Sequence, residues 1–216
     1  MEARPVTSKK PIMGLSLLAV QGNLHECFGT ISRGGLFGSH EVSNFMGFFS
    51  RKITTDKITE SLSGFFDASY GALVFDIKNI DKQILISREQ DREIMIVSMF
   101  AVVRAVFTIF GDTPITKNII GGIQYKIFNQ YFRDPAEKDQ FGNLFWERSN
   151  EYSKILSPEN KDLDIQFGQI FCSHFFGKEE DGSHLAIMML VGGLFINTMV
   201  EVKKFLNEIT SKFTII

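Results

Sequence analysis

Four side chains in the sequence could together bind a zinc ion. His25 and Cys27 stand two residues apart in "HEC", and Cys172 and His174 stand two residues apart in "CSH". On a β-strand, residues i and i+2 point to the same face, so each pair would present a thiolate beside an imidazole. Two such pairs make a tetrahedral zinc set. The alternative is two separate half-buried cysteines, a frequent position for this residue type, and we favour it. We therefore expect no bound metal and no cofactor.

Catalytic motifs are scarce elsewhere in the sequence. It contains no Gly-x-Ser-x-Gly, Walker, His-Glu-x-x-His or Cys-x-x-Cys motif, and its acidic residues are dispersed. The glycine-rich stretch "SRGGLFGS" lacks the Gly-Lys-Ser/Thr that a phosphate-binding loop needs. The stretch "FWERSNEY" is read as the boundary face of a helix with Trp146 half buried, rather than as a ligand cage. We predict no catalytic residues, and we rank a binding module above an enzyme.

Composition limits the class of protein. The chain has 216 residues, 44% of them hydrophobic and 22% charged, which is typical of a soluble globular protein. A net charge of −2 provides no field that would recruit nucleic acid or an anionic membrane. Two widely spaced cysteines form no disulfide framework and favour a reducing compartment, so we expect a cytoplasmic protein. The 22 phenylalanines indicate a bulky core or apolar contact surfaces.

One segment near the C-terminus raises the question of a membrane. Residues 184–200 carry no formally charged side chain, but the most apolar part ends near Ile196. That is shorter than the roughly 20 residues that a bilayer span needs. We expect a buried core helix and no transmembrane segment. Whether residues 185–196 are core, covered by a partner or associated with a membrane is left open by the sequence.

The stretch "DKQILISREQDREIMIV", residues 81–97, decides the predicted fold class. As a helix it would place apolar side chains on all sides instead of along one stripe. As strands, residues 84–86 and 94–97 are two short blocks rich in β-branched residues around one charged tip. We predict a β-hairpin whose strands are central and covered on both faces.

The remaining elements are assigned from periodicity, caps and turns. A first hairpin spans 12–32, and helices are predicted at 39–49 and 54–67. A strand is predicted at 70–80. Thr113-Pro114 and Asp134-Pro135 each begin a helix, since a capping side chain followed by proline is typical of helix starts. The alternation in "LDIQFGQIFCSHFF" predicts a strand at 163–174, and Ser183 begins a long final helix.

This order of elements resembles the longin-like and roadblock-like domains over residues 11–156. The resemblance rests on "IMGLSLLAVQGNLHECF", "SHEVSNFMGFFSRK", "KQILISREQDREIMIV" and "IGGIQYKIFNQYF". It implies an α+β fold in which helices sandwich a five-stranded antiparallel sheet. Residues 157–216 would add a strand and a long helix packed on that domain, and residues 1–10 would be a disordered tail.

The resemblance also implies a function. Domains of this family serve as non-catalytic interaction modules, as scaffolds or regulators of small GTPases and trafficking-type complexes. A protein partner, for instance a small GTPase, or a homodimer is then expected. The alternatives are a protein that binds an apolar ligand or cofactor, and a zinc-supported enzyme that uses His25, Cys27, Cys172 and His174. Partner identity and oligomeric state are not indicated by the sequence.

Overall fold

The computed structural model describes residues 51–156, 161–177 and 184–216. The chain divides into two units, residues 1–47 and 48–216, and all the described residues belong to the second. The predicted tail at 1–10, the hairpin at 12–32 and the helix at 39–49 lie outside the described residues, and so do His25 and Cys27.

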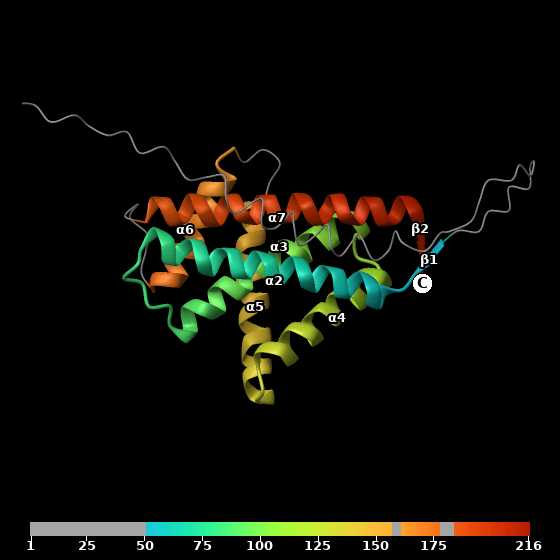
Figure 1. The fold of residues 1–216 in the computed structure, drawn as a ribbon, viewed down its shortest axis with the longest axis horizontal. Coiled ribbons are helices and arrows are strands. Elements are labelled where there is room, and N and C mark those ends of the chain that lie inside the picture. The colour runs from blue at the N-terminus through green and yellow to red at the C-terminus, as the bar shows by residue number, and fades with distance from the viewer. Residues whose placement is uncertain (1–50, 157–160, 178–183) are drawn as a thin grey trace, which may run out of the picture. The chain divides into compact units, whose positions relative to one another are not determined.

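The described residues form six helices and one pair of short strands (Figure 1). The helices are α2 (Thr55–Ile80), α3 (Arg88–Phe110), α4 (Pro114–Tyr131), α5 (Pro135–Ile155), α6 (Leu163–Phe176) and α7 (Leu185–Lys212). Strands β1 (Arg51–Ile53) and β2 (Phe213–Ile215) pair in parallel, with Lys52 opposite Thr214. This pairing ties the start of α2 to the end of α7.

Helix α3 is the core of this unit. It packs against α2, α4, α5, α6 and α7. Its residues from Glu93 to Val103 are all buried. A helix enclosed on every side must be apolar all round, and this explains why α3 has no polar stripe.

The hairpin predicted at 81–97 is wrong. Residues 81–87 form the connection between α2 and α3, and Leu85 in it is 91% exposed. Helix α3 then begins with a capping box, in which the Ser87 hydroxyl accepts a hydrogen bond from the Gln90 amide N–H and the Gln90 side chain accepts one from the Ser87 amide N–H. The charged stretch that looked like a hairpin tip is the first turn of this helix.

Two further strand predictions are also wrong, and with them the α+β fold class. Residues 70–80 continue α2, where Phe66, Leu73 and Ile77 are buried at helical spacing. Residues 163–174 belong to α6, which buries Phe167, Phe171 and Phe175 at intervals of four. In the part of the chain that the structure describes, β1 and β2 are the only strands. The five-stranded antiparallel sheet implied by the longin and roadblock resemblance is therefore not the architecture.

The two helix starts predicted from proline are confirmed. The Thr113 hydroxyl accepts a hydrogen bond from the Thr116 amide N–H at 3.3 Å, ahead of Pro114. The Asp134 carboxylate accepts one from the Ala136 amide N–H at 3.0 Å, ahead of Pro135. The helix predicted at 54–67 is also present, as the first half of the longer α2.

Helices α6 and α7 approach each other closely through two glycines. A Cβ atom on Gly168 would overlap the backbone carbonyl of Met188, and one on Gly192 would overlap that of Asp164. The two contacts place α6 and α7 antiparallel, since the residue numbers run in opposite directions across the pair. Only glycine, which has no Cβ atom, allows the two helix backbones to approach each other this closely.

By length and composition, two of the described helices could cross a membrane. In α3, 72% of the most apolar 18-residue window is buried within the protein, as in a core helix. In α7 the corresponding share is 33%, and Leu185, Met189 and Val200 are each about half exposed.

Candidate functional site

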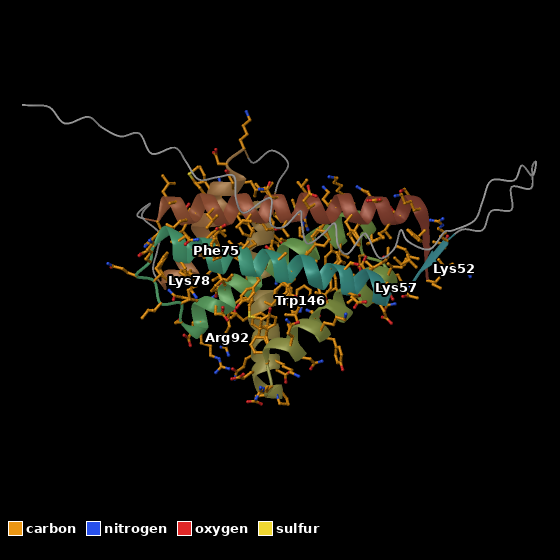
Figure 2. The ribbon with its side chains drawn as sticks, viewed as in Figure 1. Lys52, Lys57, Phe75, Lys78, Arg92 and Trp146 are labelled. Carbon is orange, nitrogen blue, oxygen red and sulfur yellow. The ribbon has the colours of Figure 1, made fainter. Side chains whose placement is uncertain are left out.

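Two adjoining hollows lie on either side of Trp146 on α5 (labelled in Figure 2). The first hollow, about 210 Å³, lies between α3 and α5 and is lined by Phe100, Val103, Arg104, Phe107, Trp146, Ser149, Asn150 and Ser153. The second hollow, about 410 Å³, lies between α4 and α5 and is lined by Gln124, Phe128, Lys138, Asp139, Gly142, Asn143 and Trp146. We call the two together the α5 groove.

The periodicity of α5 produces this groove. Its buried side chains, Phe141, Phe145, Ser149 and Tyr152, follow one another at intervals of three and four residues. The same spacing leaves a second stripe facing outward, from Asp139 through Trp146 to Ser153. At 1.5 Å per residue, that stripe is roughly 21 Å long. Phe128 of α4 contacts Phe141 of α5, so α4 borders the near half of the stripe and α3 the far half.

Trp146 is the anchor of the groove. Its side chain is 42% exposed, and it is the one tryptophan of the sequence. This agrees with the prediction of a half-buried residue on a boundary face. Tryptophan and arginine are the residue types most enriched where protein–protein binding energy concentrates. An exposed tryptophan between two hollows, with Arg104 close by, therefore has the composition of a binding surface.

The first hollow also contains polar groups without partners. Arg104 is partly buried, and its guanidinium forms no hydrogen bond or ion pair with the described residues. Ser149 is only 5% exposed, and its buried hydroxyl has no hydrogen-bond partner there. A buried hydroxyl left unpaired costs about 1–3 kcal/mol. The Arg104 guanidinium can donate hydrogen bonds to an acceptor that enters the hollow.

We expect Ser149→Ala to preserve or raise stability. The substitution removes a buried donor without a partner and replaces serine with a better helix former, so the free energy of unfolding should rise by about 1 kcal/mol, the lower end of that cost. For a domain of this size that is a melting temperature higher by roughly 1–4 °C. Thermal unfolding followed by circular dichroism measures it. A drop of several degrees would mean that the hydroxyl has a structural partner.

Behind the groove, a partly buried polar cluster fixes the orientation of α5. The Arg148 guanidinium lies 3.3 Å from the Glu93 carboxylate of α3 and 2.9 Å from Glu147, and His174 of α6 lies 2.7 Å from Glu151. Burial raises the pKa of the Glu93 carboxyl above its ordinary value, and the charges of Arg148 and His174 oppose that rise. Because these contacts hold one side of α5 against α3 and α6, Trp146 is held outward.

Tyr152 belongs to the same cluster. It is fully buried, its hydroxyl has no hydrogen-bond partner, and its ring stacks on Phe167 at 4.4 Å. Burial raises its pKa well above the ordinary value, and the charges of Glu93 and Glu151 add to the rise. Tyr152 is therefore neutral at physiological pH and serves as a core aromatic residue.

The structure describes only one of the two pairs of the candidate zinc set, Cys172 and His174, and that pair does not lie on a strand. Cys172 and His174 lie on a helix, where residues i and i+2 do not share a face. Cys172 is buried, whereas His174 contacts Glu151. Over residues 51–156, 161–177 and 184–216, no group of three or more histidine, cysteine or acidic residues could hold a metal ion. His25 and Cys27 lie outside these residues.

Sequence reasoning missed Arg104 and Ser149. Arg104 is the one charged residue between Glu93 and Asp112, in an otherwise apolar run, and this isolation was the available signal.

No family model, no curated protein and no solved structure matches the chain.

Proposed function

We propose that this protein is a non-catalytic interaction module whose α5 groove binds a peptide segment of a partner protein. The observation that carries the proposal is the exposed Trp146 between two hollows that together line one face of a helix. The expectation of a small GTPase partner came from a resemblance to a sheet-based fold, and the proposal does not include it.

The length of the groove supports a helical peptide as its occupant. Sites for small molecules usually enclose about 300–1,000 Å³. The first hollow, at about 210 Å³, is smaller and suits one or two side chains, whereas the second, at about 410 Å³, falls within that range. The outward stripe of roughly 21 Å matches about four turns of a helical peptide, which would place side chains one turn apart into successive hollows.

Selection of peptides on the full-length protein tests the proposal. A random peptide library is panned against it. The affinity of a selected peptide is then measured by calorimetry for wild type, Trp146→Ala and Tyr125→Ala. Trp146→Ala should weaken binding at least tenfold, because truncating a central anchor of this type removes much of the binding energy. Tyr125→Ala is the matched control, since Tyr125 is a 71% exposed aromatic residue on α4 outside both hollows, and it should change affinity less than twofold. Equal affinity for wild type and Trp146→Ala would contradict the proposal.

A further inference from the structure

We infer that the first hollow recognises a carboxylate side chain next to an apolar side chain, so that the partner segment of the α5 groove carries a glutamate or aspartate within one helical turn of its apolar anchor. This inference rests on the proposed function and specifies the chemistry of the partner. It is carried by the juxtaposition of Arg104 and Ser149 with the apolar wall of Phe100, Val103, Phe107 and Trp146.

The charge of the first hollow favours an anion. Of its eight lining residues, Arg104 alone is charged. The second hollow differs, because Lys138 and Asp139 offset each other there and the Lys138 ammonium already donates to the Asn129 side chain at 2.5 Å. The preference for an acidic group is therefore confined to one end of the groove.

The available donors suit a carboxylate in particular. The planar guanidinium of arginine presents parallel N–H groups that match the two oxygens of a carboxylate. Ser149 lines the same hollow, is more than nine-tenths buried, and has a hydroxyl that bonds to no described residue. Hydrogen bonds to a charged acceptor in such a partly enclosed site are stronger than those between neutral groups.

The apolar wall sets the second requirement. Phe100 is 3% exposed and Val103 is 3% exposed, so the floor of the hollow is desolvated. An occupant that placed only a charge there would lose hydration without apolar contact in return. An aliphatic or aromatic side chain beside the carboxylate satisfies both parts of the hollow.

A pair of small probes tests the site chemistry independently of any peptide. 3-Phenylpropanoate and its neutral analogue 3-phenylpropanamide are titrated into the full-length protein, with the indole resonance of Trp146 as the readout. The acid should bind at least fivefold more tightly than the amide, and Arg104→Gln should abolish that difference. Equal binding of the two probes, or a preference unchanged in Arg104→Gln, would overturn the inference. Circular dichroism of Arg104→Gln is expected to match wild type, because the Arg104 guanidinium forms no hydrogen bond or ion pair with the described residues.

The selected peptide supplies the second test and separates the two proposals. Replacing its acidic residue by the corresponding amide should weaken binding about tenfold to wild type and leave binding to Arg104→Gln unchanged. A peptide that depends on Trp146 but not on its acidic side chain would retain the proposed function and reject the inference. A probe preference that depends on Arg104, in a protein to which no peptide binds through Trp146, would support the carboxylate site and reject the interaction module. If binding depended only on the C-terminal carboxylate of the peptide, the acidic side chain would be rejected as the source of the recognised carboxylate.

Discussion

Replacing Gly192 by alanine should destabilise the protein strongly, although alanine is the better helix former. The new methyl group would overlap the backbone carbonyl of Asp164 on α6, so the two helices must separate. Overpacking of this kind typically costs 1–3 kcal/mol, and a clash with backbone belongs at the upper end or beyond it. We expect a loss of at least about 3 kcal/mol, a melting temperature lower by roughly 6–12 °C.

The matched control is the adjacent glycine of the same helix. A Cβ atom on Gly193 would meet nothing within 4 Å, so Gly193→Ala should raise stability by about 0.5–1 kcal/mol through helix propensity alone. Chemical denaturation of both variants measures the contrast. If Gly192→Ala and Gly193→Ala were equally stable, α6 and α7 would not meet as described.

Replacing Arg148 by methionine should be comparably damaging. The change leaves the Glu93 carboxylate, whose side chain is 7% exposed, without its cation inside the protein. Breaking a buried ion pair from one side costs about 3–5 kcal/mol, because the remaining charge is uncompensated. Equilibrium unfolding at pH 7 should show a loss of that order. A loss below about 1 kcal/mol would mean that the pair is effectively solvated.

The direction of the pH dependence follows from Glu93. Its folded pKa is raised, so the folded state binds more protons than the unfolded state between the ordinary and the raised value, and stability falls as pH rises through that window. Arg148 is the main charge that lowers the Glu93 pKa, so its removal raises that pKa further and extends the pH window upward. The deficit of Arg148→Met should therefore be smaller at pH 5 than at pH 7. The double variant with Glu93→Gln should recover much of it, and a double variant less stable than Arg148→Met would contradict this account.

Local signals in the sequence predicted some elements and concealed others. Caps followed by proline located α4 and α5 correctly, because those signals depend only on adjacent residues. Helix α3 was mistaken for a hairpin because enclosure by five helices erases the polar stripe that identifies a helix. The Ser87-x-x-Gln90 capping box was the local sign that could have identified it. The alternating apolar residues of α6 predicted a strand. The buried face of the helix is instead formed by Phe167, Phe171 and Phe175, which recur at every fourth residue.

The candidate site was only partly foreseeable. Trp146 was placed on a boundary face from the mixed aromatic and charged residues around it. Its association with Arg104, more than 40 positions earlier, depends on how α3 and α5 pack, and no local pattern records that packing. The zinc set was a hypothesis about strands, and Cys172 and His174 lie on a helix instead.

The fluorescence of Trp146 tests the α5 groove most directly, because this residue is the one tryptophan of the chain. A selected peptide without tryptophan is titrated into the full-length protein while emission and quenching by acrylamide are recorded. If the peptide covers the half-exposed indole, the emission should shift to shorter wavelength and quenching should fall at least twofold, with the same dissociation constant as calorimetry gives. Binding by calorimetry with unchanged emission and unchanged quenching would place the peptide elsewhere and contradict the account.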